Sequence, residues 1–311
     1  MLIVQKFGGS SIADGDRLRR AAGICMRQRQ NGNEVVVVVS AMGDTTDLLA
    51  DRARVLGGKP SPREMDALIT TGEQQSAALL VMTMESLGIP AVSLAGWQAG
   101  IYTDCRYGDS DIRLIAPVRI REALGRGRVP VVTGFQGVCA AGDITSLGRG
   151  EGDRCEIYTD VDGIYTADPR LIPDAVKLSA IDYRDMLALA GAGSQVLHAK
   201  SVELAMANSV VIHLLSSFTD APGSQVRALR DGSRPDFAGI TRSRVSGEIS
   251  LAGKAADAAA LSRAVLLLAA EGIEVLSGSV GDGRISVLVE EAEQPHAMQL
   301  LHREMILGAL K

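Results

Sequence analysis

The chain has 311 residues, with 32 lysines and arginines against 37 aspartates and glutamates, and therefore a formal net charge of −5. Hydrophobic residues make up 46% and charged residues 22%, which is typical of a globular protein and argues against disorder. Aromatic residues make up only 3%. The acidic balance and the few aromatic rings argue against a general nucleic-acid binder, which needs a cationic surface and rings for stacking. The length favours about two domains.

The cysteines and histidines show no metal-binding pattern. The four cysteines are widely spaced and the four histidines are scattered, so we expect no metal site and interpret the cysteines as reduced thiols. They are Cys25, Cys105, Cys139 and Cys155. Lys6 interrupts the apolar N-terminal run, which argues against a signal peptide, and no apolar stretch reaches the about 20 residues of a membrane span. The sequence therefore predicts a cytoplasmic protein that binds neither nucleic acid nor membrane.

Strand and helix patterns alternate along the first two thirds of the chain. Residues 1–6 read as a short buried strand, residues 14–30 keep helical spacing with Asp14 as N-cap, and the five valines at 35–39 predict a strand covered on both faces. In chain order, the further expected elements are helices at 47–55 and 65–87, strands at 91–94, 129–133 and 155–159, helices at 183–190 and 199–208, and a strand at 210–215. This alternation predicts an α/β domain with a mainly parallel sheet flanked by helices.

A different pattern follows a turn-rich stretch at residues 216–235. The expected order is strand 248–252, helix 258–271, strands 274–279 and 285–289, and helix 294–305. This order predicts a ferredoxin-like α+β module, which has four strands when complete, so residues 237–242 supply the fourth strand or it is missing. We therefore expect a first domain at 1–223, a linker at 224–236 and a module at 237–311.

One motif carries a chemical signal of its own. Lys6-Phe7-Gly8-Gly9-Ser10 follows the first expected strand, and a glycine pair in this place lets backbone N–H groups approach a phosphate while Lys6 supplies a positive charge. An ordinary turn is the alternative interpretation. The motif matches neither the dinucleotide-binding Gly-x-Gly-x-x-Gly nor the Walker Gly-Lys-Ser pattern.

Several motifs together, in a fixed order, resemble the aspartate kinases of the amino-acid kinase superfamily. They are Lys6–Ser11, Ser40–Thr46, Thr71–Glu73, Gly134–Gly137, Ser146–Gly150, Cys155–Gly163 and Tyr165–Arg170. The resemblance covers residues 2 to about 223, and it implies an amino-acid-kinase-like fold. It also implies transfer of the γ-phosphoryl group of ATP, with Mg²⁺, to the side-chain carboxylate of L-aspartate. The product would be 4-phospho-L-aspartate, at the first step of lysine, threonine and methionine biosynthesis.

The resemblance also implies roles for individual residues. The catalytic residues would be Lys6 and Asp153, and the substrate would be bound by Ser40, Thr46, Glu73 and Arg149. Glu73 would meet the α-ammonium group, and Arg149 would hold a carboxylate with its planar guanidinium. The nucleotide would be bound by Lys6, Gly8, Gly9, Ser10, Thr159, Asp160, Tyr165 and Arg170. On local grounds alone, Glu73 also reads as a carboxylate at a helix start, and Asp160 as a turn residue.

The chain departs from the family at Gly148–Arg154. In the family a helix separates the glycine-arginine motif from the strand that begins with Cys155, whereas here only Arg154 stands between Asp153 and Cys155. Parallel neighbours in a sheet need a crossover of about a dozen residues. We therefore expect either a rebuilt local fold or residues absent from the printed sequence. A catalytically impaired homologue that regulates or binds ligands is the alternative function.

The C-terminal segment departs as well. Phe237–Thr241 resembles the entry to the first of two ACT regulatory modules, and Glu248–Gly253 and Arg284–Val289 resemble the second, so most of the first module is expected to be absent. An amino-acid effector at this ACT-like module is one interpretation, and an appendage that only stabilises or dimerises is the other. An exposed edge strand favours pairing of two chains, hence a homodimer. A kinase for glutamate, N-acetylglutamate or a nucleotide is a further alternative, which Thr71-Gly72-Glu73 disfavours.

Overall fold

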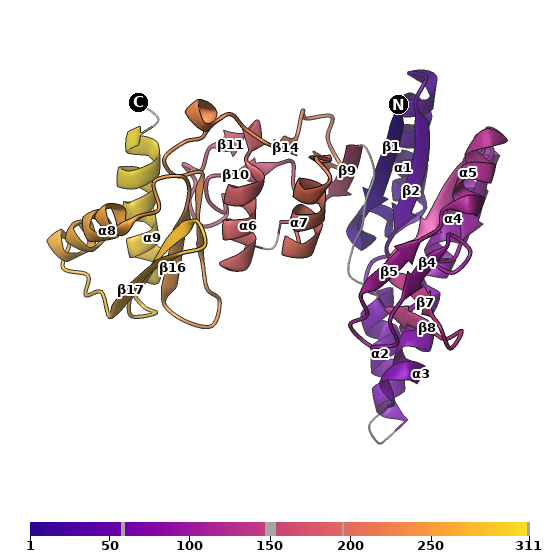
Figure 1. The fold of residues 1–311 in the computed structure, drawn as a ribbon, viewed down its shortest axis with the longest axis horizontal. Coiled ribbons are helices and arrows are strands. Elements are labelled where there is room, and N and C mark those ends of the chain that lie inside the picture. Colours follow the sequence, from indigo (N-terminus) through magenta and orange to yellow (C-terminus); the bar gives the residue numbers. More distant parts are fainter. Residues whose placement is uncertain (57–59, 147–153, 195, 310–311) are drawn as a thin grey trace. The chain divides into compact units, whose positions relative to one another are not determined.

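The computed structural model describes residues 1–56, 60–146, 154–194 and 196–309. The contacts divide the chain into two compact units, each of which is described by itself (Figure 1). The first unit comprises Met1–Asp162 and His213–Ala221, and the second comprises Gly163–Ile212 and Pro222–Lys311. The domain boundaries expected from the sequence, 1–223, 224–236 and 237–311, stay a prediction.

The elements of the first unit follow the alternating pattern of its sequence. Its helices are η1 (Gly9–Ile12), α1 (Gly15–Gln30), α2 (Thr45–Val55), α3 (Pro62–Ile69), α4 (Thr71–Ser86) and α5 (Val118–Gly125). Its strands are β1 (Leu2–Phe7), β2 (Glu34–Val39), β3 (Ala91–Leu94), β4 (Ile101–Thr103), β5 (Ile112–Ile115), β6 (Val129–Thr133), β7 (Gln136–Cys139), β8 (Ile144–Ser146), β9 (Arg154–Thr159) and most of β13 (Val211–Ser216). As expected, Asp14 caps α1, because its side chain accepts a hydrogen bond from the backbone N–H of Arg17.

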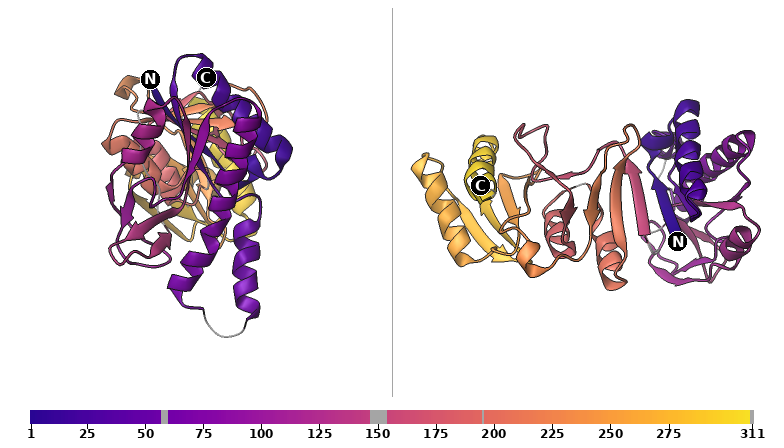
Figure 2. Two further views of the ribbon diagram at one scale, coloured as in Figure 1. Left: turned by 90° about the vertical axis from the view of Figure 1, so that its right-hand side faces the viewer. Right: turned by 90° about the horizontal axis from the view of Figure 1, so that it is seen from above.

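The main sheet of this unit has the strand order β13-β9-β1-β2-β6-β3. The pairings of β9 with β1, β1 with β2, β2 with β6 and β6 with β3 are all parallel. Val35, Val37 and Val39 pack with buried residues of α1 and α4 on one face, and Val36 and Val38 pack on the other, with residues of α5. The sheet and its helices can be followed from two further sides in Figure 2. Helices on both faces explain why β2 is hydrophobic throughout. The predicted α/β class with a mainly parallel sheet is confirmed.

The expectation of one long helix at residues 65–87 is wrong. The structure has two helices there, α3 and α4, which meet at Thr70. The hydroxyl of Thr70 donates to the carbonyl oxygen of Asp66 at 2.7 Å, and that of Thr71 donates to Leu68 at 2.7 Å. Such side-chain bonds compete with the helical ladder, so two successive threonines mark the point where α3 ends.

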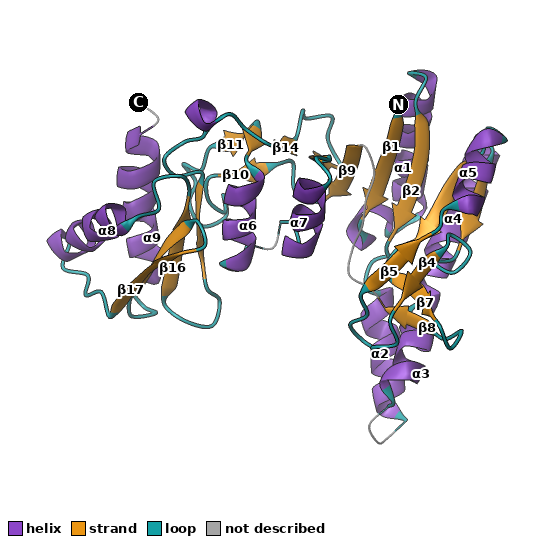
Figure 3. Cartoon of the chain, in the orientation of Figure 1, coloured by secondary structure: helices purple, strands orange, loops and turns teal. Residues whose placement is uncertain are grey.

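A second, smaller sheet was not expected from the sequence. It has the order β5-β4-β7-β8 and lies next to α3, and its strands are labelled in Figure 3. Its loop before β5 is joined to β7 by a disulfide between Cys105 and Cys139, which are 34 residues apart. The expectation that all four cysteines are reduced thiols is therefore wrong for this pair, whereas the buried Cys25 is a free cysteine.

The second unit contains a helical pair and several short strands. Its helices before the C-terminal module are α6 (Tyr183–Gly191), α7 (Ala199–Ala207) and the short η2 (Asp231–Ser233), and its strands there are β10 (Ile164–Tyr165), β11 (Lys177–Leu178), β12 (Ala180–Ile181) and β14 (Ser224–Val226). Asp182 caps α6 and accepts a hydrogen bond from Leu229 at 2.9 Å, and Asp185 pairs with Arg234 at 2.5 Å. Residues 224–236, which were expected to form a linker, are therefore bound to α6 by a hydrogen bond and an ion pair.

Residues 237–309 form a module, called the C-terminal module below. Its elements are β15 (Gly239–Arg242), β16 (Glu248–Ala252), α8 (Ala258–Ala270), β17 (Ser277–Gly281), β18 (Arg284–Leu288), α9 (Gln294–Leu301), a π-helical turn η3 (His302–Ile306) and η4 (Leu307–Ala309). The sheet is antiparallel, in the order β15-β16-β18-β17. Of the two alternatives expected for the fourth strand, the structure has the first, because residues 237–242 contain β15. Within the described ranges, no helix is long and apolar enough to cross a membrane.

Candidate functional site

The carboxyl ends of four parallel strands meet at one edge of the main sheet. The backbone N–H of Ser40, after β2, donates to Phe7 at the end of β1 at 3.1 Å, and that of Gly134, after β6, donates to Val39 at 2.8 Å. The N–H of Gly8 donates to Tyr158 in β9 at 3.2 Å. Ligands of open α/β sheets bind outside the carboxyl ends of the strands. This edge is therefore the candidate site. The first three motifs, Lys6–Ser11, Ser40–Thr46 and Thr71–Glu73, lie at it.

The glycine pair forms a close turn at this edge. A Cβ atom at Gly9 would lie 2.5 Å from the carbonyl oxygen of Ala41, so only glycine fits there without a backbone shift. The carbonyl oxygen of Gly9 accepts a hydrogen bond from Gly43 at 3.1 Å. A Cβ atom at Gly8 would lie 3.7 Å from Nζ of Lys6, so this ammonium group lies beside the turn. The structure thus brings Lys6, Gly8 and Gly9 together as the phosphate motif requires.

The two serines after the glycine turn, Ser10 and Ser11, are both held by hydrogen bonds. Ser10, in η1, accepts a hydrogen bond from the Arg17 guanidinium at its carbonyl oxygen, at 2.5 Å. The hydroxyl of Ser11 donates to the carbonyl oxygen of Tyr158 at 3.2 Å and accepts from the hydroxyl of Ser217 at 2.6 Å. Ser11 and Ser217 were missed as site residues by the sequence reasoning. Ser11 stood inside the quoted motif, whereas Ser217 is 206 residues away and carried no local signal.

Glu73 is a buried carboxylate in the first turn of α4, with 3% of the residue exposed. Its Oε1 accepts a hydrogen bond from the backbone N–H of Ala41 at 3.2 Å, whereas Oε2 is buried without a hydrogen-bond partner. Burial raises the pKa of Glu73 to about 7. A Cβ atom at Gly72 would lie 2.9 Å from Cβ of Ala41, so α4 sits directly against the strand end after β2. The glutamate and the glycine turn therefore share one neighbour, Ala41.

Ser40 and Thr46 complete the substrate side of the prediction. Ser40 is half-buried directly after β2, and Thr46 is half-buried in the first turn of α2. The loop between them is fixed by the hydroxyl of Thr45, which donates to the carbonyl oxygen of Met42 at 2.6 Å. Both predicted residues thus flank the loop that contacts Gly9.

The predicted nucleotide residues divide between the two units. Thr159 ends β9, and its hydroxyl donates to the exposed carboxylate of Asp160 at 3.1 Å, in the first unit. Tyr165 ends β10 in the second unit, where exposed Arg170 pairs with Asp168 at 2.7 Å. The hydrogen bond from Arg170 holds the pKa of Asp168 below its ordinary value. A shared nucleotide surface of these four residues stays a prediction.

Arg149 and Asp153 lie outside the described residues, as does Glu151. On either side of them, β8 belongs to the small sheet, and β9 pairs in parallel with β1 from Arg154 to Tyr158. The expectation that the segment after Asp153 is rebuilt or lacks residues stays a prediction.

Phe135 and Gln136 are further residues at this edge that the sequence reasoning did not assign. Phe135 directly follows the turn after β6, has a left-handed φ of +62° and is 44% exposed. Strain of this kind in a non-glycine residue concentrates at functional sites. The side-chain amide of Gln136 donates to the carbonyl oxygen of Thr70 at 2.9 Å, and its Oε1 is buried without a partner. Both residues lie in the motif Gly134–Gly137, which was the signal in the sequence.

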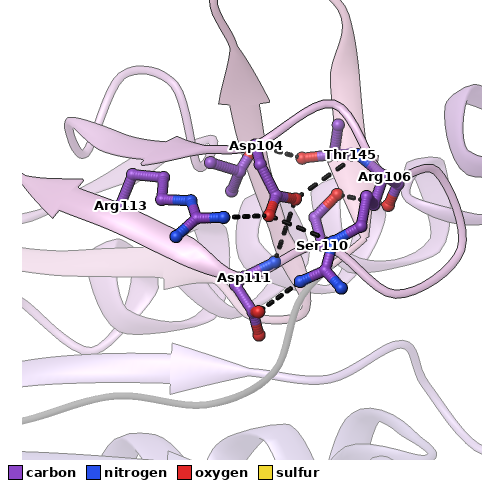
Figure 4. A network of polar contacts seen from close by, with 7 residues as sticks. Asp104, Arg106, Ser110, Asp111, Arg113 and Thr145 are labelled. Atoms are coloured by element: carbon purple, nitrogen blue, oxygen red, sulfur yellow. Dashed lines mark hydrogen bonds and ion pairs between the residues drawn. The ribbon is translucent and has the colours of Figure 1, made fainter.

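Two acidic residues hold the small sheet in place. The buried carboxylate of Asp66, in α3, accepts hydrogen bonds from the N–H of Gly108 at 2.9 Å and from the N–H and hydroxyl of Ser146 at 3.1 and 3.0 Å. Asp104 accepts from the N–H of Asp111 at 3.2 Å and from the guanidinium of Arg113 at 2.8 Å, as Figure 4 shows. These contacts shape the loop between β4 and β5. Among the described residues, no group of three His, Cys, Asp or Glu could hold a metal ion.

Comparisons with known proteins agree with this arrangement. The model of the amino acid kinase family matches residues 1–216. The aspartokinase of Mycolicibacterium smegmatis is 45% identical over 269 residues, which cover 81% of this chain and 64% of the relative. That of Thermus thermophilus is 42% identical over 287 residues, which cover 88% and 71%. That of Corynebacterium glutamicum is 39% identical over 331 aligned positions, which cover 99% and 79%. The chain thus spans only part of the length of these relatives, from 64% of the first to 79% of the third.

Solved structures show the same fold. The aspartate kinase of Synechocystis has a TM-score of 0.66 and 28% identity, covering 98% of this chain and 69% of that one. Aspartokinase III of E. coli, solved in complex with aspartate and ADP, has a TM-score of 0.84 and 20% identity, covering 98% and 100%. The chain therefore belongs to the amino acid kinase family, among the aspartokinases.

Proposed function

We propose that the chain is an aspartate kinase, which transfers the γ-phosphoryl group of ATP to the side-chain carboxylate of L-aspartate and forms 4-phospho-L-aspartate. The observation that carries the proposal is Glu73. Its carboxylate is buried beside the glycine turn and has one oxygen without a partner. A buried carboxylate is costly unless it is paired with a cation, and the α-ammonium group of an amino acid is such a cation. The relatives, all aspartokinases, support aspartate as this amino acid.

The glycine turn suits the phosphate groups of ATP. Phosphoryl transfer needs positioning and neutralisation of charge more than covalent help. We propose that the ammonium group of Lys6 and the backbone N–H groups of Gly9 and Ser10 hold the transferred phosphate. Gly9 is required because the turn passes so close to Ala41.

Mg²⁺ fits the same edge of the sheet. This ion is bound in proteins by one or two carboxylates together with substrate phosphates, and it needs no cage of protein ligands. The exposed carboxylate of Asp160, at the end of β9, is of this kind. We propose that Asp160 holds the ion, which would neutralise charge on the phosphates, whereas Thr159 orients the carboxylate through its hydroxyl.

The finer proposals concern Arg149 and Asp153, the C-terminal module, the pairing of two chains and the metabolic role. We propose that Arg149 holds a carboxylate of aspartate and that Asp153 acts with Lys6 in the transfer. We also propose that an amino-acid effector binds the C-terminal module, and that the exposed edge strand β17 pairs with a second chain in a homodimer. The reaction would serve lysine, threonine and methionine biosynthesis.

The test is ATP consumption by the purified full chain. With MgATP, ADP formation should depend on L-aspartate and be at least tenfold slower with glutamate or N-acetylglutamate. Glu73→Gln removes the charge that meets the ammonium group, so KM for aspartate should rise about 100-fold, as loss of a buried charged partner costs about 3 kcal/mol. Glu85→Gln, an exposed site on the same helix, is the matched control and should leave KM unchanged. Binding of ATP without aspartate-dependent turnover would refute the proposal and favour the impaired homologue.

A further inference from the structure

The segment that carries Tyr165 and Arg170 is closed at its base by one buried residue, Thr166, which is 1% exposed. The segment leaves β10 and returns in β11, which pair antiparallel. The N–H of Thr166 donates to the carbonyl oxygen of Val176 at 2.9 Å, and the N–H of Val176 donates to the hydroxyl oxygen of Thr166 at 2.9 Å. Thr166 and Val176 thus fix the two ends of the loop that contains Arg170.

Thr166 also contacts the C-terminal module, through its backbone and through its side chain. Its carbonyl oxygen accepts a hydrogen bond from the N–H of Ile240, in β15, at 2.8 Å. Its hydroxyl lies 2.9 Å from Nε2 of His302, the first residue of the π-helical turn after α9. A Cβ atom at Gly239 would lie 3.2 Å from the carbonyl oxygen of Thr166, so the strand approaches the loop closely. The module therefore contacts the loop where the loop is closed.

The loop also shares its hydrophobic core with the module. Ala167 and Ile172 are buried in one cluster with Ile240 of β15 and Leu301 of α9. Two loop residues thus need the module in order to be covered. The position of the loop depends on this packing as well as on hydrogen bonds.

His302 is suited to a permanent polar contact at this point. It is 1% exposed, and burial lowers its pKa, against the opposing effect of Asp174, so the imidazole is neutral at neutral pH. A neutral ring nitrogen can either accept from the Thr166 hydroxyl or donate to it, and both arrangements keep the bond. A buried polar pair of this kind specifies one geometry, because leaving either partner unsatisfied is costly.

We propose that His302 is a positioning residue for nucleotide binding. Through Thr166, it lets the C-terminal module hold the loop that contains Arg170 and directly follows Tyr165, so the module is a structural part of the nucleotide site. The inference rests on the proposed function, since the nucleotide roles of Tyr165 and Arg170 belong to it. The alternative is that His302 only stabilises the module and has no effect on nucleotide binding.

The test compares three variants of the full chain. His302→Leu keeps the volume but removes the hydrogen bond, and His302→Gln keeps a hydrogen-bonding group near the position of Nε2. Ser286→Ala is the matched control, because the hydroxyl of Ser286 makes a buried 2.7 Å hydrogen bond with Ser250 on the neighbouring strand of the module's own sheet. All three lie in the module, and only the first two concern the loop.

The first readout is hydrogen exchange, which requires no ligand. His302→Leu should speed exchange of the Val176 and Ile240 amides by about tenfold, the loss expected for one buried hydrogen bond, whereas Ser286→Ala should not. The second readout is the dissociation constant of ADP from calorimetric titration. His302→Leu should weaken it about tenfold, His302→Gln should restore most of the loss, and Ser286→Ala should leave it unchanged.

The outcomes separate this inference from the proposed function. If the unmodified chain binds no ADP, the proposed function fails, and the nucleotide role of His302 fails with it. If the unmodified chain binds ADP and His302→Leu binds it equally well, the inference alone is wrong. Equal losses in His302→Leu and Ser286→Ala would reduce His302 to a stabilising residue. Should His302→Leu not fold, Thr166→Val removes the hydroxyl from the loop side, together with its bond to Val176, and should weaken ADP binding at least as much.

Discussion

Asp66 is the residue that fastens the small sheet to α3, and its replacement should loosen the first unit by an amount that depends on the substitute. The residue is 1% exposed, and its carboxylate accepts three hydrogen bonds, two at Oδ2 and one at Oδ1. The donors are the N–H groups of Gly108 and Ser146 and the hydroxyl of Ser146. All three bonds join α3 to the small sheet and the loop before β5.

These three hydrogen bonds predict different losses in the free energy of unfolding for two variants of Asp66. In Asp66→Ala the three donors lose their acceptor, and the loss of a buried charged partner costs about 3–5 kcal/mol. In Asp66→Asn the amide oxygen can take the place of Oδ2 and accept from both N–H groups, while the amide nitrogen donates to the hydroxyl of Ser146. Only the charge is then lost, at a cost of about 1–2 kcal/mol.

Thermal unfolding of the full chain, followed by calorimetry, measures the difference. For a unit of this size 1 kcal/mol corresponds to about 2–4 °C in Tm, so Asp66→Ala should lower the Tm of the first unit by about 6–20 °C and Asp66→Asn by about 2–8 °C. Asp51→Ala, which removes an exposed carboxylate paired with Arg54 on α2, should change Tm by less than about 2 °C. Equal losses in the alanine and asparagine variants would refute the hydrogen-bond account, as would a loss in Asp66→Ala no larger than in Asp51→Ala.

Three other changes test the site and the small sheet. Because burial raises the pKa of Glu73 to about 7, and only its charged form attracts an ammonium group, kcat/KM for aspartate should rise with pH through about 7 and then level off; a profile unchanged in Glu73→Gln would contradict this. Gly9→Ala would place a methyl group 2.5 Å from a backbone oxygen and should lower kcat by about 100-fold, whereas Gly23→Ala, with open space around it, should not; equal kinetics in the two variants would count against the tight turn. Reduction of the disulfide between Cys105 and Cys139 should lower the free energy of unfolding by about 3–4 kcal/mol, as loss of a 34-residue cross-link predicts, and an unchanged urea midpoint in dithiothreitol would argue against the bond in solution.

Patterns that depend on neighbouring residues predicted the main sheet well. Five consecutive valines can only be a strand that is covered on both faces, and β2 is packed on both. The N-cap of α1 and the β-α-β-β-α order of the C-terminal module are local in the same sense. The expected strand at 274–279 begins three residues before β17, because the apolar Val275 and Leu276 resemble strand residues.

The features that were missed depend on residues far apart in the sequence. The small sheet consists of strands of three or four residues, too short for a period-two pattern to emerge. The burial of Glu73 follows from the close approach of Ala41, 32 residues away, and the contact of Ser11 with Ser217 spans 206 residues. Composition therefore indicated the class of fold, and the motifs indicated the edge of the sheet, but the pairing of side chains across it required the folded chain.

The central claim is that the chain forms an acyl phosphate on aspartate, and hydroxylamine trapping tests it most directly. The purified full chain, incubated with MgATP, L-aspartate and hydroxylamine, should yield aspartyl hydroxamate, because hydroxylamine attacks the acyl phosphate and releases phosphate. The yield should track ADP formation, and it should fall about 100-fold at low aspartate in Glu73→Gln while Glu85→Gln stays unchanged. ADP formation without hydroxamate, or no product from a chain that still binds ATP and aspartate, would contradict the account.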